Sequence, residues 1–203
     1  MDKKNFALVG FTGGADSIFT LDFCKKLGLN PLCVYLNYPR YMNQLKSVLL
    51  LAKKFKVNLD IIDISEDYFT GLIKQLKSNK KPCSFCMEYK LNLLKNYAIK
   101  KSIPFLILGS VYSDKGPVEI EKKLVIIHLP YLLNMGEKEV VREVRKIINK
   151  GVVYGCPVPE IIKNNHITIN KKLKQFWLKK LKNWGGNLNK KWLREQEERL
   201  STY

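Results

Sequence analysis

The sequence has no apolar run long enough to cross a lipid bilayer, which excludes a protein built on membrane-spanning helices. Its longer apolar stretches, such as residues 48–52, fall far short of the about 20 residues that a spanning helix needs. The apolar run that follows Met1 is also too short for a secretory signal peptide. We therefore expect a cytoplasmic protein with no membrane contact.

Acidic residues are scarce, because 18 Asp and Glu stand against 36 Lys and Arg and leave a formal net charge of +18. Such an excess favours a polyanionic partner, of which nucleic acid is the first candidate. A lysine-rich proteome accounts for part of the excess, but it explains less well why basic residues crowd the C-terminal segment. An apolar content of 46% in 203 residues is enough for one folded domain of ordinary size.

Neither of the commoner phosphate-loop motifs, G-x-x-x-x-G-K-[ST] and G-x-G-x-x-G, occurs in the chain. A different glycine loop, FTGGADS, follows a short apolar run that predicts a strand and precedes a helical pattern. We expect Asp16 and Ser17 to cap that helix. Gly13 and Gly14 allow close approach to the backbone, and the helix N-terminus presents unpaired N–H groups. The pattern predicts a phosphate site, and an ordinary glycine turn is the weaker alternative.

Strand and helix patterns alternate through the first three quarters of the chain. Apolar runs predict strands at residues 5–10, 31–36, 57–64, 105–109 and 124–129. Apolar residues with helical spacing lie at residues 18–23, 45–55, 69–76, 87–98 and 140–148. This alternation predicts an α/β fold, a doubly wound parallel sheet with helices on both faces and ligands at the carboxyl ends of its strands. We expect residues 1–168 to form this domain and residues 169–203 to form a basic helical C-terminal extension.

The five cysteines fall into two groups. Cys24 and Cys33 lie within helix and strand patterns, which predicts plain core residues. Cys83 and Cys86 form a C-x-x-C pair at the start of a predicted helix, where the helix N-terminus and nearby lysines favour the reactive thiolate. Cys156 lies in a predicted tight turn and could itself be a core thiol. The spacing alone leaves zinc, iron–sulfur, redox exchange and persulfide transfer open.

The glycine loop resembles the S-G-G-x-D-S loop of the PP-loop ATP pyrophosphatases, with Thr12 in place of the first serine. The resemblance implies a Rossmann-like fold of the PP-loop or HUP type, in which this loop grips the pyrophosphate part of ATP and the substrate is adenylated. The residues that it assigns to the phosphates are Thr12, Gly13, Gly14, Ala15, Asp16 and Ser17. The expected topology also places Tyr35 and Asn37, at the end of the second predicted strand, near the adenosine.

Two later segments extend this resemblance. Residues 108–114, LGSVYSD, stand where PP-loop enzymes carry a Gly-His-x-x-x-Asp segment after the fourth strand. Gly109 and Asp114 match, which implies contacts to the nucleotide or to magnesium. Ser110 stands in place of the histidine, so the role of that histidine does not carry over. Residues 128–140 look like the family's entry into its next helix.

Cys83, Cys86 and Cys156 resemble the three-cysteine set of tRNA-thiolating PP-loop enzymes, of the two-thiocytidine and two-thiouridine synthetase type. There three thiolates hold a [4Fe-4S] cluster and leave one iron open for sulfide. The resemblance implies a sulfur transferase that uses ATP and Mg²⁺, takes sulfur from sulfide or a sulfur carrier and acts on tRNA, with Asp16 and the three cysteines as catalytic residues. Relatives of this type commonly pair, so a homodimer fits the resemblance. Zinc is the alternative metal, with His128 or His166 as the fourth ligand.

The segment from Lys171 to Arg199 carries ten lysine or arginine residues, three glutamates and all three tryptophans. Leu173, Trp177 and Trp184 share one face of a predicted helix that ends at two glycines, and a second short helix is expected after it. We expect the tryptophans to dock on the core or on a second subunit, and the lysines to contact tRNA.

Three other functions stay open at this point. The first is a PP-loop sulfur transferase that acts on a small-molecule carboxylate or a protein. The second is a zinc-containing, nitrogen-transferring PP-loop ligase. The third is a nucleotide-binding subunit that has no catalytic activity of its own.

Overall fold

The computed structural model describes residues 5–41, 44–148 and 156–185, together with Arg194 and Glu198; within 180–185 it describes the backbone. The chain divides into two compact units, each of which is described by itself. Unit 1 comprises Met1–Asn37, Gln44–Ile62 and Lys90–Val153, and unit 2 comprises Tyr38–Asn43, Asp63–Tyr89 and Tyr154–Tyr203. No helix in the described ranges is both long and apolar enough to cross a membrane.

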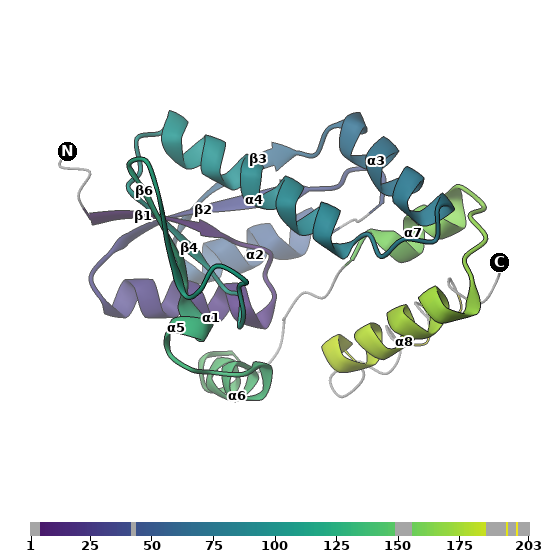
Figure 1. The fold of residues 1–203 in the computed structure, drawn as a ribbon. Coiled ribbons are helices and arrows are strands. Elements are labelled where there is room, and N and C mark those ends of the chain that lie inside the picture. Colours follow the sequence, from purple (N-terminus) through teal and green to yellow (C-terminus); the bar gives the residue numbers. More distant parts are fainter. Residues whose placement is uncertain (1–4, 42–43, 149–155, 186–193, 195–197, 199–203) are drawn as a thin grey trace. The chain divides into compact units, whose positions relative to one another are not determined.

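Unit 1 is built on a six-stranded sheet with the strand order β3-β2-β1-β4-β6-β5 (Figure 1). Its strands are β1 (Phe6–Gly10), β2 (Asn30–Asn37), β3 (Asn58–Asp63), β4 (Phe105–Leu108), β5 (Val118–Glu121) and β6 (Leu124–His128). Parallel pairs join β1 to β2, β1 to β4 and β4 to β6, whereas β5 runs antiparallel to β6. The predicted α/β fold with a doubly wound, mostly parallel sheet is confirmed.

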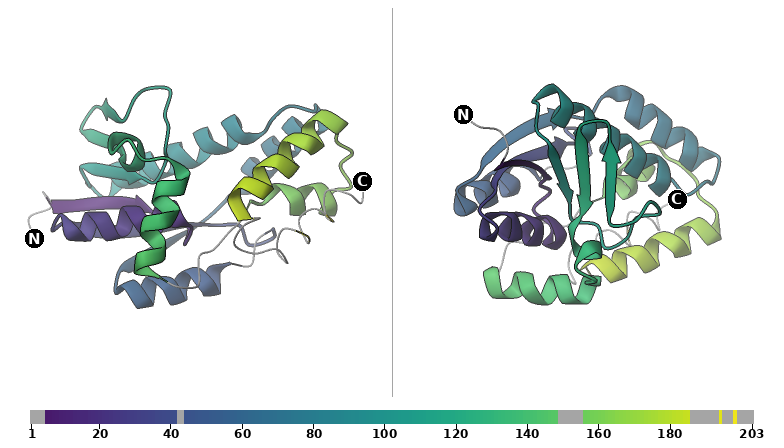
Figure 2. Two further views of the ribbon diagram at one scale, coloured as in Figure 1. Left: turned by 90° about the horizontal axis from the view of Figure 1, so that it is seen from below. Right: turned by 60° about the vertical axis from the view of Figure 1, so that its left-hand side comes forward.

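Three helices cover one face of this sheet, and α6 packs on α1 (Figure 2). They are α1 (Ala15–Lys26), α2 (Leu45–Phe55) and α6 (Glu137–Ile147). The core beneath them joins side chains of the central strands, such as Val9 and Ile107, to Ile18 of α1 and Val144 of α6. Burying one such aliphatic side chain contributes about 1.5–3 kcal/mol. Cys24 and Cys33 belong to this core, as predicted.

The second half of α4 (Cys83–Lys100) also belongs to unit 1 and approaches the end of β1. A Cβ atom at Gly10 would lie 3.1 Å from Cδ1 of Leu94, so a glycine at this position lets the helix lie close to the strand. The short helix α5 (Leu129–Leu132) follows β6 directly, with His128 as its N-cap residue.

Unit 2 is helical in the part that the structure describes. It contains α3 (Glu66–Lys77), the first turns of α4, α7 (Val158–Asn164) and α8 (Lys171–Gly185), and α3 contacts α7. Its buried side chains include Tyr68, Leu72, Ile161 and Trp177. Only 1% of Trp177 is exposed, so its predicted docking on the protein core is confirmed. The side chains of Trp184 and Trp192 lie outside the described residues.

Some local predictions are wrong, for identifiable reasons. Gly14 is the N-cap residue of α1, because the helix begins at Ala15 and therefore contains Asp16 and Ser17. The strand β5 and the helix α7 were not predicted, because each is short and gains its stability from contacts with other elements. Most of the expected second C-terminal helix lies outside the described residues. The boundary between residues 168 and 169 stays a prediction.

Candidate functional site

The loop between β1 and α1 has the conformation of an anion-binding loop. Gly13 has a φ of +74°, a left-handed conformation that a side chain would strain. Thr12 accepts a hydrogen bond from the Gly14 N–H at 3.3 Å, and its hydroxyl donates to Ser17 Oγ at 3.4 Å. The Ser17 hydroxyl donates in turn to the Gly14 carbonyl at 2.9 Å. These bonds shape the loop against the first turn of α1, whose N–H groups have no acceptor within the helix.

This loop lies at the point where the order of the strands reverses. The strands β2 and β3 lie on one side of β1, and β4, β6 and β5 lie on the other. In open α/β sheets such a switch point, at the carboxyl ends of the strands, is where ligands bind. The loops after β1 and β4 therefore border the expected ligand crevice.

Gly109, the first residue after β4, contacts the start of α1. A Cβ atom at this position would lie 2.7 Å from the backbone carbonyl of Asp16, so only a glycine fits here without a shift of the backbone. The contact joins the segment of residues 109–114 to the glycine loop. Asp114 is exposed farther along this segment, and its carboxylate raises the pKa of the nearby Tyr112 through a hydrogen bond and its charge.

Asp16 is the titratable group of the glycine loop. The residue is exposed at the protein surface, and Gly109 lies against its backbone and Cβ atom. Partial desolvation of the carboxyl group, followed by the negative charge of Glu137, raises the pKa of Asp16 to about 6. The carboxyl group therefore changes its charge close to neutral pH, beside the loop that would hold phosphates.

The two residues expected near the adenosine are both buried. Tyr35, 2% exposed, belongs to the apolar core between the sheet and the helices α1 and α2. Asn37, 8% exposed, is the last residue of β2. Their contact with a nucleotide stays a prediction.

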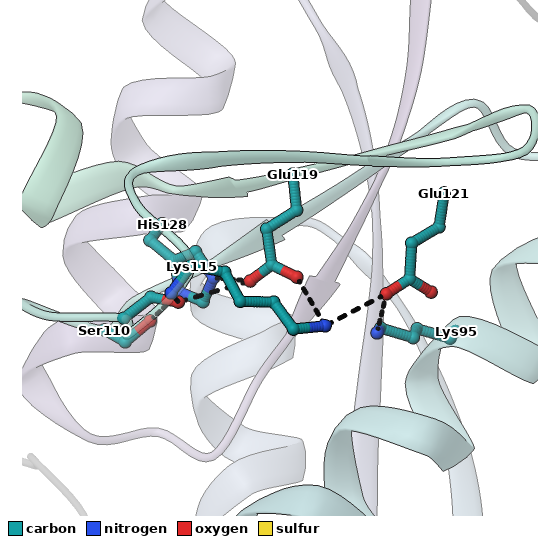
Figure 3. A network of polar contacts seen from close by, with 7 residues as sticks. Lys95, Ser110, Lys115, Glu119, Glu121 and His128 are labelled. Atoms are coloured by element: carbon teal, nitrogen blue, oxygen red, sulfur yellow. Dashed lines mark hydrogen bonds and ion pairs between the residues drawn. The ribbon is translucent and has the colours of Figure 1, made fainter.

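A polar network formed by residues after β4 and on β5 and β6 was not predicted as a site (Figure 3). Ser110 forms a hydrogen bond with Nδ1 of His128, and Nε2 of His128 lies 2.9 Å from Oε1 of Glu119. Ser113 donates to the same oxygen at 3.2 Å, and Nζ of Lys115 lies 3.4 Å from Oε2. Both ring nitrogens of His128 are engaged here, which argues against its suggested role as a zinc ligand. Glutamates alternate with apolar residues at positions 118–121, and this alternation was the sequence signal for the network.

The predicted metal ligands lie in unit 2, and all five cysteines of the chain are reduced thiols. Cys83 and Cys86 stand in the first turn of α4, as predicted, and both are half-buried, as is Cys156. Cys86 Sγ lies 3.1 Å from the Tyr68 hydroxyl. The pKa of Tyr68 is raised, chiefly by burial and then by the neighbouring groups Tyr38, Cys86 and Cys156. The thiol of Cys86 therefore contacts this phenol, and Cys156 lies close enough to influence its charge.

Aromatic side chains enclose this cysteine region. The ring of Phe85 stacks on that of Tyr68 at 5.9 Å, and Tyr89 approaches Tyr68 at 5.0 Å. The stack depends on Gly71 of α3, because a Cβ atom there would lie 2.4 Å from the Phe85 ring. Among the described residues, no group of three or more His, Cys, Asp or Glu side chains is arranged to hold a metal ion. The donor chemistry, three half-buried thiols in one unit, nevertheless suits an iron–sulfur cluster.

The helix α8 carries the first part of the predicted basic surface. Leu173 and Trp177 are buried, whereas Lys171, Lys172 and Lys179 are exposed. The described part of the helix is therefore apolar on one face and basic on the other, as its spacing predicts.

No protein-family model matches the chain. It is 27% identical over 169 residues to an uncharacterised protein of Methanocaldococcus jannaschii, a match that covers 79% of this chain and 62% of the relative. It is 25% identical over 179 residues to a tRNA-5-methyluridine(54) 2-sulfurtransferase of Pyrococcus horikoshii, which covers 77% of this chain and 57% of that protein. The chain thus spans about 60% of the length of these curated relatives.

Solved structures agree with the fold. A predicted subunit of a tRNA methyltransferase from M. jannaschii aligns with a TM-score of 0.61 and 19% identity, over 80% of this chain and 89% of that one. The U34-tRNA thiolase NcsA from Methanococcus maripaludis, solved with its [4Fe-4S] cluster, aligns with a TM-score of 0.56 and 14% identity, over 98% of this chain and 73% of that one. The glycine loop, the fold and the relatives agree with the expected resemblance to PP-loop enzymes: the chain is an α/β protein that is similar in sequence to tRNA sulfurtransferases.

Proposed function

We propose that this chain is an ATP-dependent sulfur transferase that adenylates a tRNA base and then inserts sulfur, with a [4Fe-4S] cluster held by Cys83, Cys86 and Cys156. The observation that carries the proposal is the presence, in one chain, of an anion-binding glycine loop and three half-buried thiols. The similarity to a tRNA sulfurtransferase supports it.

The glycine loop would hold the phosphates of ATP. The residues assigned to this role are Thr12, Gly13, Gly14, Ala15, Asp16 and Ser17. Their N–H groups and hydroxyls would stabilise the charge that gathers on pyrophosphate as the base oxygen attacks the α-phosphorus and the bond to pyrophosphate breaks. Gly109 would keep the crevice open, Asp114 would hold Mg²⁺, and Tyr35 and Asn37 would border the adenosine. Sulfur then displaces AMP from the adenylated base.

The cysteine region would complete the reaction. A [4Fe-4S] cluster held by three thiolates supplies an open iron that accepts sulfur from sulfide or a sulfur carrier. The chain's own part is to keep Cys83, Cys86 and Cys156 as reduced thiols within an aromatic surrounding that limits access of water. The exposed lysines of α8 would offset the charge of a tRNA backbone, with or without pairing of the chain into a homodimer.

Metal analysis tests the cluster directly. We expect iron and acid-labile sulfide in protein purified without oxygen, and loss of both in Cys83→Ala, Cys86→Ala and Cys156→Ala. Ser84→Ala is the matched control, because Ser84 is exposed in the same turn of α4. Zinc without sulfide would favour the nitrogen-transferring ligase. Full cluster content in Cys156→Ala would remove that residue from the ligand set.

Nucleoside profiling tests the substrate. We expect one thionucleoside to disappear from the tRNA of a strain that lacks the gene, and to return with the wild-type gene but not with Cys86→Ala. An unchanged profile would contradict tRNA thiolation and favour a small-molecule or protein substrate. If no pyrophosphate is released with any substrate, the chain is a nucleotide-binding subunit.

A further inference from the structure

We propose that Ser110, His128 and Glu119 form a nucleophilic serine site at the carboxyl ends of β4 and β6. At this site the Ser110 oxygen takes a phosphoryl group that carries a good leaving group. The site is separate from the cysteines, and its chemistry does not depend on the sulfur-transfer function proposed above.

The three side chains form one hydrogen-bonded chain that crosses three strands (Figure 3). Ser110 follows β4, His128 ends β6 and Glu119 belongs to the antiparallel strand β5. His128 and Glu119 are 6% and 8% exposed, whereas Ser110 is only half-buried. A buried acid and base thus point toward a hydroxyl that solvent or a ligand can reach. This order of groups, a hydroxyl, an imidazole and a carboxylate, is the one that activates serine nucleophiles.

The surroundings of Glu119 set the direction of proton transfer. Burial acts to raise the pKa of Glu119, but hydrogen bonds from His128 and Ser113 and the charge of Lys115 outweigh it, so that the pKa is lowered. The ionised carboxylate is placed to accept a hydrogen bond from the Nε2–H of His128. In that tautomer Nδ1 is the acceptor that faces the Ser110 hydroxyl.

The place of Ser110 indicates the kind of electrophile. Ser110 follows Gly109, whose backbone lies against the backbone of Asp16 in the glycine loop. Ser110 is thus one residue from the segment that contacts the loop whose α1 N–H groups would hold a phosphate. An electrophilic phosphorus atom, such as that of a phosphoric anhydride, fits this place better than an acyl group.

The proposed step is balanced without any further reactant. The Ser110 oxygen forms a bond to phosphorus, the bond to the leaving group breaks, and the leaving group keeps the electron pair. The hydroxyl proton passes to Nδ1 of His128, and Glu119 stabilises the resulting imidazolium until Nδ1 gives this proton to the leaving group. Water then attacks phosphorus, Nδ1 of His128 accepts a proton from that water and donates it to the departing Ser110 oxygen, and inorganic phosphate or a phosphate ester is released.

A fluorophosphonate probe tests the site on the full chain, without ATP or RNA. We expect one label per chain, located on Ser110 by peptide mass spectrometry. The rate should exceed that of the other serines by about 100-fold or more, the usual contribution of a positioned base. Ser110→Ala should abolish labelling.

Two further variants test how the hydroxyl is activated. His128→Gln removes the acceptor ring, and Glu119→Gln keeps the shape but removes the charge that orients the ring. Both should slow labelling by about 100-fold or more while the thermal unfolding temperature stays within a few degrees of wild type. If either variant fails to fold, selective labelling of Ser110 in the wild-type chain still tests whether this serine is a nucleophile.

A wild-type chain that is unlabelled, or labelled evenly over its exposed serines, would overturn the proposal and leave a structural hydrogen-bond chain. A Glu119→Gln variant that folds and labels at the wild-type rate would overturn the role of the carboxylate. Neither result bears on the metal and thionucleoside measurements, so the serine site and the sulfur-transfer function can fail separately.

Discussion

The glycine loop of unit 1 and the cysteine region of unit 2 are organised by different kinds of contact. In the loop, Thr12, Gly14 and Ser17 are joined by hydrogen bonds that involve the backbone, and Gly13 supplies the required left-handed conformation. In the cysteine region, the ring of Tyr68 packs against those of Phe85 and Tyr89, and its hydroxyl contacts the thiol of Cys86.

This difference indicates how each region meets its ligand. Hydrogen bonds already hold the loop in one conformation, so we expect that binding of a phosphate would need little rearrangement. The thiols belong to one unit, but among the described residues they are not arranged as a metal site. A metal cluster would therefore contribute to ordering this region, as is common where ligands come from separate segments. Changes that damage one region and spare the other test this contrast.

Gly109→Ala should have the largest effect on the loop. The added methyl group would lie 2.7 Å from the Asp16 backbone, so either the loop or the segment after β4 must move. We expect ATP affinity, measured by calorimetry, to fall by about tenfold or more, which corresponds to about 1.4 kcal/mol. Gly28→Ala is the control, because its methyl group meets open space, although its φ of +72° adds strain. Equal losses in the two variants would contradict the role of this contact.

Gly71→Ala should damage the cysteine region instead. An alanine within a helix normally stabilises by about 0.5–1 kcal/mol, but here the methyl group would collide with the Phe85 ring. We expect a loss of about 1–3 kcal/mol in the free energy of unfolding, a lower iron content and unchanged ATP affinity. Adding Phe85→Leu to this variant should relieve the collision. A stabilised Gly71→Ala protein would show that the two helices adapt freely.

The pKa of Asp16 makes the loop sensitive to pH. Because its folded-state pKa is raised to about 6, the carboxyl group is neutral below that pH and negative above it. Without Mg²⁺, the negative form should repel ATP by about 1 kcal/mol, or about fivefold in affinity. Wild type should thus bind ATP more weakly than Asp16→Asn at pH 7.5 and about equally at pH 5. The metal content of the cysteine region should not differ between them.

The raised pKa of Asp16 also makes the stability of the fold depend on pH. A carboxyl group whose pKa is raised in the folded state favours that state while it is protonated. This contribution is lost as the pH rises from the ordinary pKa of an aspartate through about 6. Thermal unfolding of Asp16→Asn should lack that part of the pH dependence. Identical unfolding profiles for the two proteins would contradict the assigned pKa.

Tyr68→Phe should have the smallest effect. It removes the hydroxyl that lies 3.1 Å from Cys86 Sγ but keeps the ring in its stack. We expect a change of about 1 kcal/mol or less in the free energy of unfolding and faster alkylation of Cys86. Tyr89→Phe is the control, because its hydroxyl contacts Ser65 and not a thiol. Unchanged alkylation would show that the phenol does not restrain the thiol.

The sequence patterns predicted the parallel strands, the glycine loop and the core positions of Cys24 and Cys33, because each depends on local periodicity or local turn chemistry. They did not predict the Ser110, His128 and Glu119 chain. Ser110 follows β4, Glu119 lies on β5 and His128 on β6, so the three meet only when β5 pairs with β6 and β6 pairs with β4. The start of α1 was also displaced by two or three residues, since a cap is decided by the surrounding contacts.

By itself, the sequence determined the α/β class of the chain, the place of the glycine loop and the two groups of cysteines, because apolar spacing and glycine position act over a few residues. Only the tertiary structure decided that Gly109 contacts the glycine loop, which ring stacks on Tyr68 and which base lies beside Ser110. Those contacts join residues that are 17 to 93 positions apart, and packing and hydrogen bonding across such distances exist only in the folded chain.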